Sequence, residues 1–119
     1  MARLLFYIKI LFVPILVIFG FAPVYSQNRI TAKYLGIADG LSNNVVTAVF
    51  RDHNSFMWFG TYDGLNKYDG YGFKVFRNII GDRNSINSNI INKIDEDLQH
   101  ELWVGGHRDV SILNPVTAK

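Results

Sequence analysis

The 119-residue chain contains no cysteine. It can therefore form neither a disulfide nor a zinc–thiolate site, and it offers no thiol to carry a lipid anchor. Export without disulfides is compatible with a bacterial periplasm.

The chain also has little net charge, with 12 Lys and Arg against 10 Asp and Glu. Arg3 and Lys9 lie in the N-terminal segment, and their removal leaves 10 basic residues, equal to the 10 acidic ones. A near-neutral chain lacks the basic surface on which nucleic-acid binding depends. We therefore expect no nucleic-acid partner.

Residues 1–26 have the composition of a helical secretory signal peptide. Two basic residues precede a charge-free, mostly apolar run over 10–25, and a small residue precedes a cleavage point at Ser26–Gln27. An uncleaved membrane anchor is the alternative. The run is shorter than the roughly 20 residues that span a bilayer, and it contains two prolines. We predict a periplasmic protein with no direct membrane contact after cleavage.

The remaining sequence, 27–119, repeats itself. A shift of 45 positions, without a gap, aligns apolar positions with apolar positions and superimposes identical residues such as Asn44 on Asn89, Asp52 on Asp97, Trp58 on Trp103 and Gly60 on Gly105. Units of about 40–50 residues made only of strands are typical of propeller blades.

Apolar runs and turn signals such as Asp63–Gly64 divide each unit into strands. We predict an all-β fold, an incomplete β-propeller of about two four-stranded antiparallel blades. The expected parts are an outer strand over 30–35, a blade over 45–77 (strands 45–50, 56–61, 65–68 and 72–77) and an incomplete blade over 90–113 (strands 90–96, 101–106 and 109–113).

Fewer than two blades leave apolar sheet faces without a neighbour. Closed propellers use roughly 4–8 blades, and stacked repeats need about three to bury a continuous core. We therefore expect a fragment: the start of a longer protein, a truncated reading frame, or a piece that assembles with others. Its expected partners are the remaining blades of a longer receptor or a second chain.

The repeated residues are predicted to be structural. The two tryptophans could stack on sugar rings, but equivalent mid-strand positions favour core packing. We assign the repeat core to Trp58, Gly60, Trp103 and Gly105. Asp52 and Asp97 precede equivalent turns and are predicted to cap them.

No motif predicts a metal, a cofactor or catalysis. His53, His100 and His107 show no metal-ligand spacing, which favours surface or turn positions. The acidic run Asp95–Glu96–Asp97 has no second acid-rich site that would complete a glycosidase. We therefore expect no enzymatic activity from this chain.

Binding, if it occurs, is expected in loops, because propellers commonly bind ligands at one end of the channel. The predicted ligand-contacting residues are Asn43, Asn44, Tyr62, Asp63 and Asn89.

From Trp58 to Gly70 the sequence reads W-x-G-T-x-x-G-L-N-x-Y-D-G. With the repeated turns, it resembles the two-component regulator propeller repeat, which opens the periplasmic sensor region of Bacteroidetes-type hybrid two-component systems. The resemblance covers residues 30–115. The second unit departs from the motif, with Gly106 for Thr61, Asp109 for Gly64, and Leu113–Asn114 for Tyr68–Asp69.

The resemblance implies a parent that is a histidine kinase with many blades, a β-sandwich domain, a membrane span, receiver domains and a DNA-binding module. It also implies that an oligosaccharide is the signal. None of the kinase motifs can be placed on this chain. The leading hypothesis is thus a segment of a sensor propeller. The alternative is an exported interaction or structural module that oligomerises through its blade edges. A propeller enzyme is a third, less favoured hypothesis.

Overall fold

The computed structural model describes residues 1–5 and 29–117. The chain divides into two units, Met1–Ala32 and Lys33–Lys119. Most of the predicted signal peptide, 6–26, lies outside the described residues. Within the described ranges, no helix is long and apolar enough to cross a membrane.

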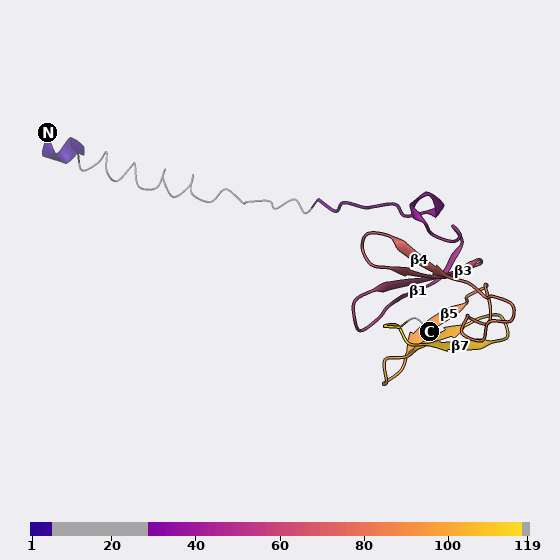
Figure 1. Cartoon of the computed structure of the whole chain (residues 1–119). Coiled ribbons are helices and arrows are strands. Elements are labelled where there is room, and N and C mark those ends of the chain that lie inside the picture. Colours follow the sequence, from indigo (N-terminus) through magenta and orange to yellow (C-terminus); the bar gives the residue numbers. More distant parts are fainter. Residues whose placement is uncertain (6–28, 118–119) are drawn as a thin grey trace. The chain divides into compact units, whose positions relative to one another are not determined.

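The second unit consists of two antiparallel sheets, each with its strands in sequence order (Figure 1). The first sheet contains β1 (Val46–Arg51), β2 (Met57–Thr61), β3 (Gly64–Tyr68) and β4 (Phe73–Phe76). The second contains β5 (Lys93–Glu96), β6 (Leu102–Gly105) and β7 (Val110–Leu113). A single 3-10 turn, η1 (Ile37–Asp39), precedes them in this part of the described chain. The predicted all-β, antiparallel architecture is confirmed.

Tight turns hold the first sheet together. β2 and β3 are joined by two residues, and Gly64 adopts a φ of 127°. A Cβ at Gly64 would lie 2.6 Å from the carbonyl oxygen of Phe76, so a side chain there is excluded by both conformation and space. At the β3–β4 turn, Asp69 Oδ1 accepts the backbone N–H groups of Tyr71 (2.8 Å) and Gly72 (2.9 Å).

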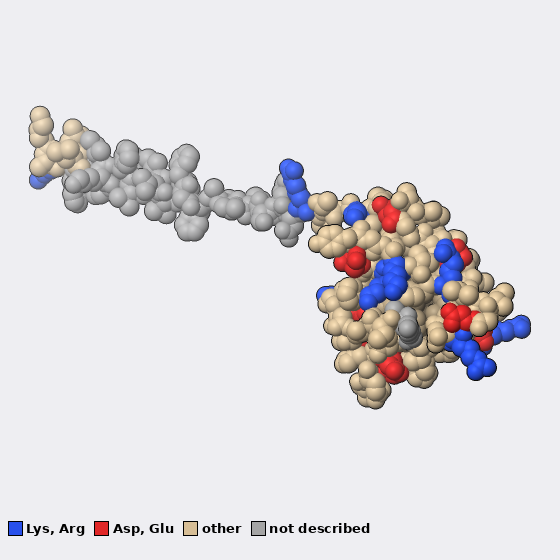
Figure 2. Space-filling model, in the orientation of Figure 1, with Lys and Arg blue, Asp and Glu red and all other residues tan. Residues whose placement is uncertain are grey.

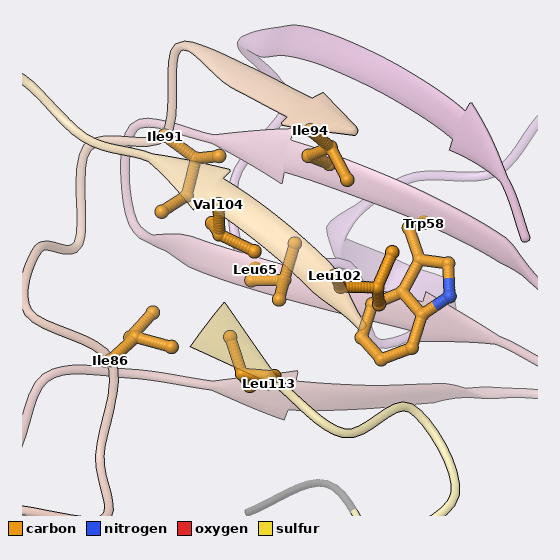
Figure 3. Close-up of a cluster of buried hydrophobic side chains, with 8 residues drawn as sticks. All are labelled: Trp58, Leu65, Ile86, Ile91, Ile94, Leu102, Val104 and Leu113. Atoms are coloured by element: carbon orange, nitrogen blue, oxygen red, sulfur yellow. The ribbon is translucent and has the colours of Figure 1, made fainter. Parts of the chain in front are cut away.

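The core lies between the two sheets (Figure 3). Strand β1 lies next to β5, and the side chains of β2 and β6 meet between the sheets. The buried residues are Trp58, Leu65, Ile86, Ile91, Ile94, Leu102, Val104 and Leu113. Gly60 allows close approach, because a Cβ there would lie 2.6 Å from Ile91 Cγ2. Each sheet therefore buries one face against the other.

The predicted strand over 30–35 is wrong, since these residues form no strand. A strand needs a neighbouring strand to pair its backbone N–H and C=O groups. In the described sheets, β1 to β4 pair among themselves and so do β5 to β7, so no strand pairs with residues 30–35.

The predicted strand over 90–96 begins later, at Lys93. The backbone before it bonds to the first sheet instead: Ile91 N donates to Thr61 O (2.9 Å), and Asn89 O accepts Gly64 N (2.7 Å). These bonds join the sheets.

Candidate functional site

The turn between β1 and β2 is built by Asp52. Its Oδ1 accepts the backbone N–H of Phe56 (2.9 Å), and its Oδ2 accepts the indole N–H of Trp58 (2.8 Å). Asp52 is buried, and both of its carboxylate oxygens are hydrogen-bonded. One side chain therefore closes the turn and orients the core tryptophan, which confirms the predicted turn-capping role.

The turn between β5 and β6 repeats this arrangement. Asp97 Oδ1 accepts the backbone N–H of Glu101 (2.9 Å), and Oδ2 accepts the indole N–H of Trp103 (2.9 Å). The bond from the indole, followed by that from the Glu101 N–H, lowers the pKa of Asp97 below its ordinary value. Even the backbone repeats, because Ser55 and His100 occupy equivalent positions with φ values of 70° and 63°.

Trp103 corrects one expectation. Trp58 is 0% exposed in the core between the sheets, whereas Trp103 is 43% exposed. On β6, Leu102 and Val104 point into that core, so Trp103 lies on the opposite face. Within the described residues no sheet covers that face.

The predicted ligand-contacting residues gather at one end of the two sheets. Asn89 adjoins the β2–β3 turn through its carbonyl bond to Gly64. In that turn, Tyr62 is 55% exposed, and Asp63 forms an ion pair with Arg77 (Oδ2–Nη2 2.9 Å). Whether a ligand binds these loops stays a prediction.

The three asparagines shape the loops around that end. Asn43 Oδ1 accepts Val45 N (2.7 Å), Asn44 Oδ1 accepts Ile37 N (3.2 Å), and Asn89 Oδ1 accepts Asn78 N (2.7 Å). Within the described ranges, none of their amide NH₂ groups donates a hydrogen bond. Their oxygens are engaged while their donors can still meet a ligand.

A buried polar group beneath this end was not found from the sequence. Asn66, in the middle of β3, accepts Ser42 N at its Oδ1 (2.8 Å) and donates to Ser42 Oγ (2.8 Å) and Phe59 O (3.1 Å). Ser42 Oγ lies 2.8 Å from Thr61 Oγ1. An asparagine within a strand was the available signal, because such a residue needs polar partners.

A second cluster lies at the opposite end of the sheets. His53 belongs to the β1–β2 turn, Glu96 ends β5, and His100 belongs to the β5–β6 turn. Each offers a ligand atom, and these atoms lie within 4.8 Å of one another. The sequence did not predict this cluster, because His53 is distant in the chain from Glu96 and His100. The 45-residue repeat could have revealed it, since equivalent turns of neighbouring blades lie close together.

Sequence comparison identifies the repeated unit. The family model described as two component regulator propeller matches residues 40–63, the segment that holds the Asp52 turn and β2. Over those residues the chain is similar to the two-component regulator propeller repeat. Histidine kinase P4 of Formosa agariphila is 48% identical over 48 residues, which cover 40% of this chain and 4% of that kinase.

Solved structures similar to this chain include extracellular domains from B. thetaiotaomicron. One, described as from a hybrid two component system, superimposes with a TM-score of 0.67 at 33% identity, over 73% of this chain and 12% of that domain. Another gives a TM-score of 0.53 at 26% identity, over 56% of this chain and 9% of that domain. This chain therefore spans a small part of its relatives, and their extracellular placement supports an exported location.

The solved structures that this chain resembles include extracellular domains of two-component systems. The acidic run of this chain is used structurally: Asp97 caps a turn, Glu96 binds His53, and Asp95 lies 3.5 Å from Lys93 Nζ. Acidic and basic side chains are interspersed over the face shown in Figure 2.

Proposed function

We propose that this chain is part of the periplasmic sensor propeller of a hybrid histidine kinase and contributes to recognition of an oligosaccharide signal. The observation that carries the proposal is the likeness, at 33% identity over 73% of this chain, to an extracellular domain of a hybrid two component system. Residues 1–26 would direct export. The remaining protein would supply the kinase.

The end of the sheets that carries the predicted ligand-contacting residues has groups suited to binding a sugar. An exposed tyrosine ring offers a face on which a pyranose can stack, and the amide donors of the nearby asparagines can bond hydroxyl groups. In the whole receptor, a ligand that binds one arrangement of the periplasmic region better than another would shift the equilibrium and so bias the kinase.

A further blade would cover the Trp103 face of the second sheet. On the first sheet, Ile91 of the neighbouring unit fills the space over Gly60; over Gly105 the nearest atom to an added Cβ lies 3.7 Å away and belongs to Lys93. Trp103, Val110 and Ile112 are exposed on the second sheet. An isoleucine of a next repeat, equivalent to Ile91, would pack over Gly105.

The first test is the genomic DNA that follows the codon for Lys119. We expect more propeller repeats and then a kinase, in or near the same frame. Unrelated sequence there would overturn the assignment to a receptor and leave an independent exported module or a relic.

Ligand binding is tested by titrating the purified chain with an oligosaccharide panel and following amide chemical shifts. We expect shifts at the β2–β3 turn that are lost in Tyr62→Ala. The matched control is Tyr71→Ala, because Tyr71 is 96% exposed at the opposite end of the first sheet. Binding that survives Tyr62→Ala, or that Tyr71→Ala removes equally, would place the ligand elsewhere.

A second candidate function is an exported interaction module. Its support is the same exposed apolar face, together with the unpaired outer edges of β4 and β7 among the described strands. Solution mass separates the two: a discrete closed oligomer favours the module, whereas a monomer or open-ended aggregation favours a severed receptor.

A further inference from the structure

We infer that His53, Glu96 and His100 form a binding site for a divalent transition-metal ion of the Zn²⁺ class, and that the ion would join the two sheets. The inference is independent of the proposed sensing role, since the site lies at the end of the sheets away from the predicted ligand-contacting loops.

The three donors are already gathered. His53 Nδ1 and Glu96 Oε1 are hydrogen-bonded, and His100 Nδ1 lies 3.6 Å from the same carboxylate oxygen. Donors on one tetrahedral zinc lie about 3.3 Å apart, because the bonds are roughly 2.0–2.2 Å long. Only small movements would therefore place an ion between the three atoms.

The carboxylate is held in place from the backbone. His53 N donates to Glu96 Oε2 (3.1 Å), which leaves Oε1 directed at the imidazoles. The Glu96 side chain is only 12% exposed, and the two imidazole rings stack at 3.9 Å between centroids with 27° between their planes. A carboxylate that is oriented and partly shielded in this way lowers the ordering cost of binding a metal.

The donor set selects the class of metal. Two imidazoles and one carboxylate suit zinc, copper or nickel, whereas calcium and magnesium prefer oxygen ligands alone. Three protein ligands would leave one position for water. The nearby Asp97 is not a ligand, because Trp103, Gln99 and Glu101 already occupy its oxygens.

The ion would link the blades because its ligands come from both. His53 lies in the first unit of the repeat, and Glu96 and His100 lie in the second. Binding would replace the His53–Glu96 hydrogen bond, and the ring proton of a neutral His53 would move from Nδ1 to Nε2.

The test is calorimetric titration of the chelator-treated, purified chain with Zn²⁺ alone, with Mg²⁺ as a second titrant. We expect one Zn²⁺ per chain and no Mg²⁺ binding at equal concentration. His53→Asn, Glu96→Gln and His100→Asn should each weaken Zn²⁺ binding by at least about tenfold. The matched control is His107→Asn, because His107 is an exposed histidine of the β6–β7 turn.

Absence of Zn²⁺ binding, equal binding by all variants, or an equal loss in His107→Asn would overturn the site. Measurements on the unaltered chain test the site even if the variants fail to fold. Zn²⁺ should shift the imidazole nitrogen resonances of His53 and His100 but not those of His107, and slow hydrogen exchange at Ile91 N–H, which bonds across the sheets. Shifts at all three histidines, or unchanged exchange, would contradict a bridging ion.

Discussion

The two sheets carry the same turn in different surroundings. In each, an aspartate accepts a backbone N–H with one oxygen and an indole N–H with the other, with Asp–Trp distances of 2.8 and 2.9 Å. Yet Trp58 is buried and Trp103 is 43% exposed. Hydrogen-bonding geometry within a repeat is therefore local, whereas the burial of its tryptophan depends on the next sheet.

The same contrast separates the two glycines that follow the tryptophans. Gly60 lies against Ile91, a residue of the next unit, while Gly105 faces only its own sheet. In a repeat protein, each interface between neighbouring repeats buries part of the core. The second sheet packs against one neighbour and the residues on its other face stay exposed, so the comparison of the two sheets shows how much burial one interface provides.

The largest expected effect comes from truncating the two tryptophans. Trp58→Ala should lower the free energy of unfolding by about 3–5 kcal/mol, because it opens a cavity in the core. Trp103→Ala should cost roughly 1 kcal/mol, since its ring is already partly in water. Both variants lose an indole–aspartate bond, so the difference reports the burial of the ring together with that of the aspartate, which is deeper at Asp52 than at Asp97.

Urea denaturation followed by far-UV circular dichroism measures both variants. If Trp58→Ala is unfolded in water, Trp58→Phe and Trp103→Phe give the comparison on a smaller scale. Equal losses in the two sheets would contradict the difference in burial. In a longer chain that carries further blades, the proposed covering sheet should make the cost of Trp103→Ala approach that of Trp58→Ala.

A smaller effect is expected from adding one methyl group to each glycine. Gly60→Ala would place its Cβ 2.6 Å from Ile91 Cγ2, and overpacking of this kind costs about 1–3 kcal/mol. At Gly105 the nearest atom is 3.7 Å away, an ordinary contact, so Gly105→Ala should stay within about 0.5 kcal/mol of the unaltered chain. Urea denaturation measures both losses in the free energy of unfolding. An equal loss in Gly105→Ala and Gly60→Ala would mean that the second sheet is already covered in solution.

Much of the fold could be predicted because the 45-residue shift aligns both apolar patterns and turn residues. The predicted strand over 56–61 lies within one residue of β2, and the capping role of Asp52 follows from its place before a turn. These features depend on local sequence, which periodicity and turn chemistry describe directly.

What could not be predicted depends on neighbours. The alternating pattern over 30–35 indicated a strand, yet a strand needs a partner that no pattern supplies. The backbone of Ile91 bonds to the first sheet, so β5 begins after it, at Lys93. Trp103 is exposed, whereas the equivalent Trp58 is buried. The His53–Glu96–His100 cluster likewise joins two turns that are distant in the chain but close once the blades stack.

The smallest effect expected concerns acid. The pKa of Asp97 is lowered by the Trp103 indole and the Glu101 N–H, and that of Asp69 by the backbone N–H groups of Gly72 and Tyr71. A carboxyl whose pKa is lower in the folded state stabilises the fold above its unfolded pKa of about 3.9, and that stabilisation is lost as pH falls through the folded value.

Stability should therefore fall as pH drops below about 4. Asp97→Asn and Asp69→Asn should each flatten part of that dependence, one from each sheet. Carboxyl carbon chemical shifts recorded against pH measure the two titrations. Trp103→Phe removes the indole donor, so it should raise the pKa of Asp97 and leave that of Asp69 unchanged. If Asp97 titrates at its ordinary value in the unaltered chain, or if Trp103→Phe leaves its titration unmoved, the bond that makes the two turns alike is absent from the exposed sheet, and the likeness of the two repeats ends at their backbone.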